Sequence, residues 1–208
     1  MNERLVERTL RAFGDDLASS AAVPGGGSAA AYAGAMGAAL AAMVGRIAER
    51  KEQSEATTAL IAEADNLRAD FIRLVDDDSA AYARVSEAMK LPKASDAEKL
   101  ARTERIQSAL LAASRVPLEV AKTSRRLLDL CERAVGRAAT ATVSDIGVGA
   151  VLADTALRGA ALNVMINLAS IKDAAQVKAL SEDLDRAVDG ADAQRKRITD
   201  FVESRIAR

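Results

Sequence analysis

Apolar residues recur along this chain at steps of three and four, the spacing of one face of an α-helix, and no segment alternates like a half-buried strand. The pattern predicts six helices, at about residues 3–19, 28–50, 54–89, 95–135, 144–170 and 173–207. The second and the fifth are rich in alanine and glycine and nearly free of charge, which is typical of buried helices. We therefore expect an all-α fold, a compact bundle of about six helices that forms one domain over residues 1–208.

Local signals indicate where the fourth and fifth helices begin. Ser95 and Glu98 form a capping-box pattern, with serine at the cap and glutamate three residues on, and should open the fourth helix. Pro117 lies inside that helix and is expected to kink or divide it, because proline has no backbone N–H. Ser144 or Asp145 is expected to cap the fifth helix.

The second helix begins in the stretch "VPGGGSAAAYAGAMGAALAAMVGRIA", residues 23–48, which has two competing interpretations. Residues 29–45 carry no charge, which is close to the lower limit for a membrane span. Alanine and glycine gain little in lipid, however, and no aromatic residue anchors the ends. Small residues at steps of four instead predict unusually close helix packing, in a core or at a subunit interface.

The glycines before this helix, at residues 25–27, match neither a P-loop nor a dinucleotide-binding fingerprint, since the lysine of the first and the flanking strand of both are missing. Free N–H groups at the start of a helix favour an anion or a carboxylate. The alternative is that the glycines only allow a tight crossing with another helix. Both interpretations remain open at this point.

Composition excludes several classes of chemistry. The chain has 29 basic and 30 acidic residues and a net charge of −1, without a basic face for nucleic acid. It has no histidine, which removes Ser-His-Asp and Cys-His catalysis and the usual zinc sites. Its one cysteine, Cys131, lies on a helical pattern and is expected to be a core thiol. The N-terminal residues are charged throughout, unlike a signal peptide, so we expect a cytoplasmic protein that binds neither nucleic acid nor membrane.

One carboxylate interrupts an apolar stripe on the third predicted helix. The stripe runs through Leu74 to Tyr82 and on to Met89, and the position between the first two is Asp78. In "VDDDSAAY" the other two acids point off the stripe toward water. A carboxylate that faces a core is costly unless it is paired, hydrogen-bonded or used in function. Asp78 is therefore either half of a structural contact or a functional group.

The fifth predicted helix carries few polar residues, and they form two pairs. Asp154 and Arg158 are four residues apart in the favourable order, and we expect them to satisfy each other. Asn163 and Asn167 share a face at the same spacing. Such an amide pair binds backbone or a neighbouring helix, or holds the amide edges of a heterocycle.

Taken together, the ordered motifs of the chain resemble a known enzyme family. The motifs are "DLASSAAVPGGGSAAAYAGAMGAALAAMV", "VDDDSAAY", "LPKASDAEKLAR", "VPLEVAK" and "SDIGVGAVLADTALRGAALNVMINL". In this order they are similar to the methenyltetrahydrofolate cyclohydrolase / formiminotetrahydrofolate cyclodeaminase family, over about residues 10–173. The resemblance implies an all-helical protein that is a homodimer or larger homo-oligomer, with a folate site between helices near a subunit interface.

The resemblance also implies site residues. Asp78 matches the acidic residue of the family's D-x-x-A-[FY] pattern, and Lys93 matches the lysine of its L-P-K motif; these two are the candidate catalytic residues. The positions that match its substrate-binding segments are Gly25, Gly26, Gly27, Ser28, Lys51, Ser144, Asp145, Asn163 and Asn167. Two family submotifs are incomplete: "AERKEQ" keeps the basic pair of residues 50–51 without its glycine, and "RAATATVSD" lacks a Gly-Asn before the Ser-Asp.

From this resemblance we expect hydrolysis of 5,10-methenyltetrahydrofolate to 10-formyltetrahydrofolate. Asp78 would stabilise the cationic bridge and take the proton of the attacking water, while Lys93 would polarise the opening amide or keep Asp78 ionised. The two asparagines would read the pterin, and the glycine turn and basic groups would hold the glutamate tail. No metal or cofactor besides the tetrahydrofolate substrate is expected.

Two other functions compete with this expectation. Formiminotetrahydrofolate cyclodeaminase needs an acid to release ammonia, and the same aspartate would serve. The cyclohydrolase is preferred because the chain carries no formiminotransferase half and matches free-standing cyclohydrolases more closely around "DLASSA". The third possibility is a non-catalytic helical dimer that binds a folate-like ligand or another protein.

Overall fold

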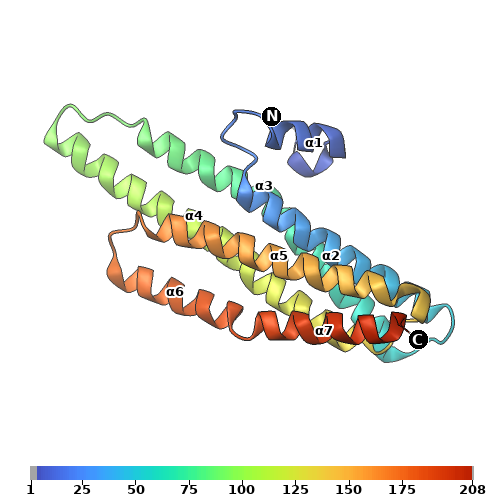
Figure 1. The fold of residues 1–208 in the computed structure, drawn as a ribbon. Helices are drawn as coiled ribbons and strands as arrows, with labels where there is room; N and C mark the ends of the chain where they lie inside the picture. Colours follow the sequence, from blue (N-terminus) through green and yellow to red (C-terminus); the bar gives the residue numbers. More distant parts are fainter. Residues whose placement is uncertain (1–3, 208) are drawn as a thin grey trace.

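The computed structural model describes residues 4–207, which contain helices and no strand (Figure 1). The all-α prediction is therefore confirmed. In chain order the elements are η1 (Leu5–Glu7), α1 (Leu10–Leu17), α2 (Gly26–Glu49), α3 (Glu55–Met89), α4 (Asp96–Val135), η2 (Thr140–Thr142), α5 (Val143–Leu168), α6 (Ala174–Val188) and α7 (Ala191–Ile206).

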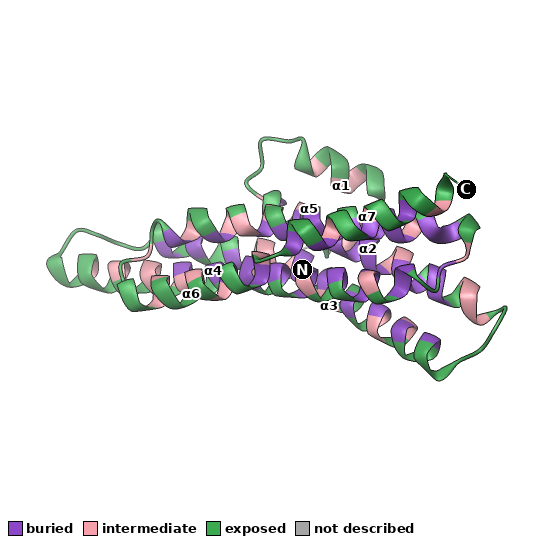
Figure 2. Ribbon diagram, turned by 60° about the horizontal axis from the view of Figure 1, so that its bottom comes forward, coloured by how far each residue is buried: buried purple, intermediate pink, exposed green. Residues whose placement is uncertain are grey.

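Four long helices make the core. α2 packs against α3 and α5, and α4 packs against the same two helices from the other side, so the four form a bundle. Buried side chains line its interior, among them Phe71 and Leu127, while α6 and α7 cover one flank (Figure 2). The α3–α4 hairpin is longer than its neighbours and projects beyond the start of α2 (Figure 1). The bundle is thus open on one side at that end.

The small residues of α2 bring helix backbones unusually close. A Cβ atom at Gly37 would lie 2.9 Å from the carbonyl oxygen of Gly149 in α5, and one at Gly34 would overlap the ring of Phe71 in α3. Side chains of ordinary size at these positions would push the helices apart. The predicted tight packing of this helix is therefore present, and the residues that carry it face α3 and α5.

Within residues 4–207, two helical segments are long and apolar enough to cross a membrane, by length and composition alone. In α2, 67% of the apolar 18-residue stretch is buried inside the fold, and in the segment Thr140–Leu168 the share is 44%. The core helix of a soluble protein passes the same test when it packs against its own chain. The burial of α2 fits such a core helix, while α5 leaves an apolar face exposed.

Several helix ends differ from the prediction. The first predicted helix breaks at Thr9, whose side chain caps α1 by accepting a hydrogen bond from the N–H of Ala12. The last is divided into α6 and α7 at Gly190, whose φ of 67° is a left-handed conformation that favours glycine. The expected cap of α5 by Ser144 or Asp145 is wrong, because the helix begins one residue earlier and has no side-chain cap. The capping box of α4 is confirmed.

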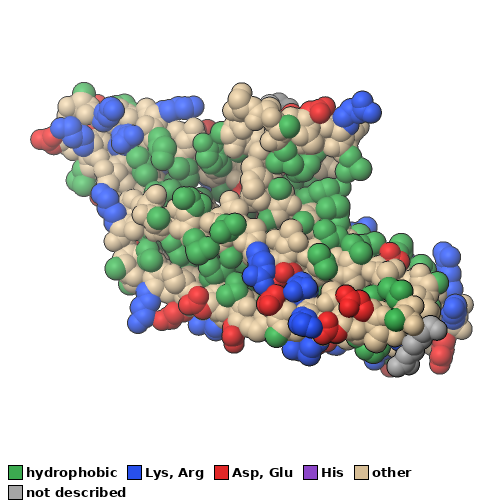
Figure 3. Space-filling view, in the orientation of Figure 1, with side chains coloured by type: hydrophobic (Ala, Val, Ile, Leu, Met, Phe, Trp, Pro, Cys, Tyr) green, Lys and Arg blue, Asp and Glu red, His purple; other side chains and the backbone are tan. Residues whose placement is uncertain are grey.

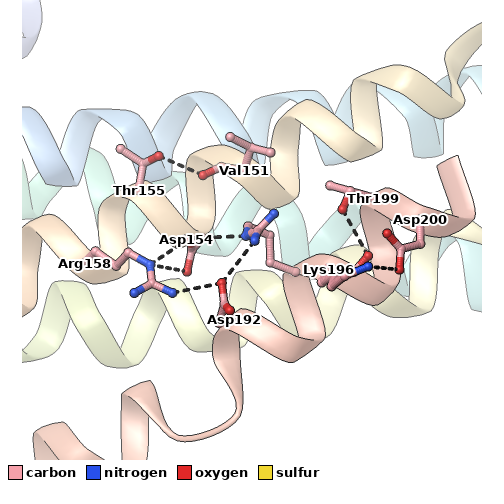
Figure 4. Close-up of polar contacts among 9 residues, drawn as sticks. Val151, Asp154, Thr155, Arg158, Asp192, Lys196, Thr199 and Asp200 are labelled. Atoms are coloured by element: carbon pink, nitrogen blue, oxygen red, sulfur yellow. Dashed lines mark hydrogen bonds and ion pairs between the residues drawn. The ribbon is translucent and has the colours of Figure 1, made fainter. Parts of the chain in front are cut away.

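The charged pair of α5 satisfies itself as predicted and also binds α7. Both carboxylate oxygens of Asp154 accept from Nε of Arg158, at 2.9 and 3.1 Å (Figure 4). Arg195 of α7 approaches the same carboxylate at 3.4 Å, and Asp192 bridges the two arginines. Because Asp154 is buried, this network fastens α7 to the bundle rather than offering a free acid for chemistry.

Candidate functional site

The three consecutive aspartates of α3 contact three different parts of the protein. Asp76 accepts from Nε of Arg4 and from the N–H of Leu5, each at 2.9 Å, and so anchors the N-terminal segment. This role differs from the expectation that Asp76 points to water. Asp77 pairs with Arg73 one turn earlier on the exposed side of α3. Asp78 points inward, as the apolar stripe predicted, and faces the start of α2.

Asp78 sits against the glycine turn that opens α2. The hydroxyl of Ser28 donates to Oδ2 of Asp78 at 2.9 Å, and the backbone N–H of Ser28 also hydrogen-bonds the carboxylate. A Cβ at Gly27 would stand 2.5 Å from Cγ of Asp78, so no side chain fits at that position without moving the carboxylate. A free N–H group of this helix start, that of Ser28, therefore binds a carboxylate of the protein itself.

Burial raises the pKa of Asp78 above its ordinary value of 3.8, and the hydrogen bonds from the Ser28 hydroxyl and N–H act in the opposite direction. A carboxylate with a raised pKa is a better proton acceptor than an exposed one, because its pKa lies nearer to that of the group it deprotonates. The environment of Asp78 is thus suited to proton transfer.

The first asparagine of α5 lies beside the same turn. A Cβ at Gly26 would come within 3.4 Å of Nδ2 of Asn163. Asn163 donates to the carbonyl of Gly159 in its own helix at 2.8 Å, and Asn167, one turn on, donates to the carbonyl of Ala113 in α4 at 3.3 Å. The structure therefore brings Asp78, the glycine turn and the two asparagines to one end of the bundle.

The stripe on α3 beyond Asp78 is open rather than buried. Tyr82 and Met89, which the pattern placed in the core, are 49% and 52% exposed. The reason is that α2 begins opposite Asp78, so it does not cover that face of α3 any further along. Figure 3 shows the surface hollowed there, between the α3–α4 hairpin and the N-terminal segment. Tyr82 thus lies one helical turn from Asp78 on the open side, a site position that the sequence pattern did not single out.

Three predicted binding residues lie at the opposite end of the bundle. Lys51 follows the last turn of α2, about 36 Å along the helix from Gly27 at 1.5 Å per residue. Ser144 and Asp145 are in the first turn of α5, which places them about 27 Å from Asn163 by the same rise. Within one chain the structure does not bring these three residues to Asp78.

Lys93 is also separate from the carboxylate. It is exposed in the loop between α3 and α4, past Met89, which is itself about 16 Å beyond Asp78 along the helix.

A cavity of about 280 Å³ lies between α3 and α4 near the hairpin tip, and its walls include Arg84 and Arg105. None of the predicted site residues lines it. Among residues 4–207 no group of three or more His, Cys, Asp or Glu side chains could hold a metal ion.

Comparison with protein families matches residues 9–186 to the family described as formiminotransferase-cyclodeaminase. Among curated proteins, the chain is 37% identical over 202 residues to a methenyltetrahydrofolate cyclohydrolase of Methylorubrum extorquens, covering 95% of this chain and 97% of that protein. It is also 36% identical over 173 residues to a formimidoyltransferase-cyclodeaminase of Gallus gallus, of which it spans 32%.

A solved structure has the same fold. The crystal structure of a formiminotetrahydrofolate cyclodeaminase from Thermotoga maritima superposes with a TM-score of 0.84 at 26% identity, over 95% of this chain and 97% of the other. The relatives with a similar length thus carry two different activity names, one a cyclohydrolase and one a cyclodeaminase.

Proposed function

The chain belongs to the formiminotransferase-cyclodeaminase family, and from this premise we propose that it hydrolyses 5,10-methenyltetrahydrofolate to 10-formyltetrahydrofolate. The observation that carries the proposal is the half-buried Asp78 at the start of α2, next to an open face with two amide side chains. The identity to a cyclohydrolase along almost the whole of both chains supports this reaction over the alternatives.

The chemical step that we propose uses Asp78 twice. The carbon between N5 and N10 of the substrate is part of a cationic amidine, and a partly desolvated carboxylate stabilises that charge more than water does. Water adds to this carbon, and Asp78 takes its proton, which leaves a neutral carbinolamine. Collapse of the carbinolamine forms the formyl carbonyl and breaks the bond to N5. N5 receives the proton held by Asp78, and the hydroxyl proton leaves to solvent. Lys93 is too far along the hairpin within one chain, and this mechanism does not use it.

The remaining site residues of this end would hold the ligand. Asn163 and Asn167 present amide groups at the same end of the bundle as Asp78 and would bind the pterin, while Tyr82 offers an aromatic face on the open side. For the glycine turn we propose a different role from the tail binding that the resemblance implied. Because Asp78 occupies the helix start, we propose that Gly25, Gly26 and Gly27 position the carboxylate and do not bind the glutamate tail.

Cyclodeaminase activity is the second candidate, because the similar protein of Thermotoga maritima, which has about the same extent, bears that name. In that reaction a protonated Asp78 would donate to the departing ammonia. A direct test is to follow methenyltetrahydrofolate disappearance by absorbance and to run 5-formiminotetrahydrofolate in parallel. Turnover of the first substrate alone supports the proposal. Turnover of the second alone makes the enzyme a cyclodeaminase, and turnover of neither contradicts both.

Removing the hydroxyl of Ser28 should change the pH dependence of the reaction. This hydroxyl lowers the pKa of Asp78, so Ser28→Ala should raise that pKa further. If Asp78 must be ionised, activity rises as pH passes its pKa, and the acidic limb of the pH–rate profile should move to higher pH. Ser79→Ala is the control, because Ser79 contacts Ser28 but not the carboxylate.

The profile is measured as kcat/KM against pH for the three proteins. An acidic limb at the same pH in the wild type and in Ser28→Ala would mean that the limb does not report Asp78. The opposite profile is one in which kcat/KM falls toward high pH and this alkaline limb shifts to higher pH in Ser28→Ala. That profile would show that Asp78 acts as an acid, as the deaminase needs.

We propose that a second copy of the chain covers the exposed face of α2 and α5. Large apolar side chains of this face are open to solvent, at Met36, Met43, Val148, Val151, Leu162, Met165 and Ile166. Figure 3 shows hydrophobic side chains gathered on the side of the molecule that α2 and α5 face, with charged ones along the edge at α6 and α7. An apolar face of this kind, rimmed by charge, is typical of a dimer interface.

A two-fold axis through this face would complete the site. α2 and α5 run antiparallel, with Gly26 against Asn163 and Gly37 against Gly149. The exposed apolar residues of α5 lie on both sides of its middle, so a two-fold axis at the middle pairs one group with the other and exchanges the two ends of the helix. The start of one α5 then lies level with the end of the other. We propose that Lys51, Ser144 and Asp145 contribute to the site across the dimer, beside the partner's Asp78.

Mixing two inactive variants tests this arrangement. Asp78→Asn and Asp145→Asn should each lose activity as homodimers, but a hybrid dimer contains one site with both native carboxylates. Random reassembly of equal amounts should restore about a quarter of wild-type activity, because half of the dimers are hybrids with one intact site of two. No recovery, with hybrids detected by mass, would place the site within one chain. Full activity of Asp145→Asn alone would remove Asp145 from the site.

The setting that we propose is cytoplasmic, with tetrahydrofolate as the one small-molecule partner and no further cofactor, nucleic acid or membrane. The near-neutral charge balance and the presence of a single, buried cysteine support it. Burial raises the pKa of the Cys131 thiol to about 12, which keeps it protonated and unreactive.

A further inference from the structure

Pro117 leaves one carbonyl in the middle of α4 without its helical partner. In an α-helix the carbonyl of residue 113 accepts from the N–H of residue 117, and proline has no N–H. α4 nevertheless runs unbroken from Asp96 to Val135, so the proline neither ends nor divides it. The carbonyl of Ala113 must find another donor or lose a hydrogen bond in a partly buried position.

Asn167 of α5 supplies that donor. Its Nδ2 lies 3.3 Å from the carbonyl oxygen of Ala113, which makes a bond between the two helices at the site end of the bundle. The contact also fixes which way the amide points. A carbonyl only accepts, so Asn167 must turn its NH₂ toward α4 and its Oδ1 away from it.

Asn163 is oriented by the same logic. Its Nδ2 donates to the carbonyl of Gly159 at 2.8 Å, which again turns Oδ1 outward. Neither oxygen has a hydrogen-bond partner among residues 4–207, and neither is fully buried, since both side chains are partly exposed. Two acceptors of fixed direction thus stand one helical turn apart at the end of the bundle where α2 begins, and the first of them, on Asn163, lies beside Gly26.

We propose that Pro117 and Asn167 form a latch that holds the outward oxygen of Asn167 in place, and that this oxygen and that of Asn163 accept from the N–H donors of a heterocyclic ligand. Resting on the proposed function, this assigns them the N–H and NH₂ edge of the reduced pterin. Pro117 is then a positioning residue for specificity, because the carbonyl that it frees is what orients Asn167. A ligand edge that offers only acceptors would be rejected, since the protein has already turned its donors inward.

The latch is tested by a double-mutant cycle on unfolding, which does not depend on any activity. Asn167→Ala should lower the denaturation midpoint, because it leaves the Ala113 carbonyl unpaired. Pro117→Ala restores the N–H that this carbonyl lacks. In that background Asn167→Ala should cost much less, and the equilibrium constant for unfolding should change about tenfold less than in the native background. Additive effects of the two substitutions would overturn the latch.

The acceptor role is tested by calorimetric binding of tetrahydrofolate to the same four proteins. Asn167→Ala should weaken binding about tenfold, the scale of one hydrogen bond, and Pro117→Ala should not rescue it, because the oxygen stays absent. Binding that recovers together with stability would mean that Asn167 is only structural, and unchanged binding would overturn its contact with the ligand. If the wild type binds no reduced folate, the proposed function fails while the unfolding cycle still decides the latch.

Discussion

Replacing Asp78 by asparagine should leave the fold intact and remove most of the turnover. Asparagine has the same shape and still accepts from Ser28, but it takes no proton from water and carries no charge to stabilise the cationic bridge. Loss of a general base typically costs about 10²- to 10⁴-fold, and loss of the charge adds to it. The effect should lie in kcat rather than in KM, because the pterin contacts are unchanged.

Asp77→Asn is the matched control for this substitution. Asp77 is the neighbouring residue on the same helix, and its partner is Arg73 on the exposed side. The pair is a surface contact between residues four apart, which contributes about 0.3–0.5 kcal/mol, so neither activity nor fold should change much. Methenyltetrahydrofolate hydrolysis at saturating substrate measures both variants. Near wild-type rates in Asp78→Asn for both folate substrates would contradict the assignment.

The stability of the Asp78→Asn variant carries separate information. The pKa of Asp78 is raised in the folded protein, so the folded state holds this proton to a higher pH than the unfolded chain does. Ionisation between the unfolded and folded pKa values therefore works against folding, and this contribution to stability falls as pH rises through that window. Asparagine does not ionise, so the variant lacks this unfavourable contribution to folding. Denaturation midpoints should show a variant at least as stable as the wild type at neutral pH.

The sequence pattern identified Asp78 for a sound physical reason but could not identify its partner. A buried acid costs free energy unless it is paired or hydrogen-bonded, and the helical periodicity locates an acid that faces the core without a structure. Which element compensates it depends on where α2 begins relative to α3, and that is set by packing between residues about fifty positions apart. The same missing information explains Tyr82 and Met89. They follow the stripe, yet α2 begins opposite Asp78 and so does not cover them.

Residues that the family resemblance assigns to one site can lie far apart within a single chain. Lys51 and Asp145 share motifs with the site but lie at the far end of two antiparallel helices. A motif records that a residue is needed without recording from which subunit it comes, so sequence alone gave no sign of the separation. Pro117 is a comparable case. Proline within a helix predicts a kink or a division, whereas α4 is not divided and the carbonyl that Pro117 frees is used by Asn167.

Two nearly identical substitutions in the glycine turn should have very different effects on turnover. Gly27→Ala places a Cβ 2.5 Å from Cγ and 2.8 Å from Oδ2 of Asp78, so the carboxylate must move. Gly26→Ala places its Cβ 3.4 Å from Nδ2 of Asn163, an ordinary contact. Displacement of a reacting group by about 1 Å can cost about 10²-fold, and we expect a loss of this size in kcat for Gly27→Ala. Gly26→Ala should stay within about threefold of the wild type, because nothing at the site is displaced.

Combining Gly27→Ala with Asp78→Asn shows whether the glycine acts through the carboxylate. If it does, the second substitution should add almost nothing in the first one's background, since the group that the methyl displaces is already inactive. Far-ultraviolet circular dichroism and gel filtration confirm that each variant keeps its helices and its oligomeric state. Multiplied losses in the double variant would mean that Gly27 contacts the ligand itself. Equal losses in the two glycine variants would contradict the geometry of the turn, because only Gly27 faces the acid.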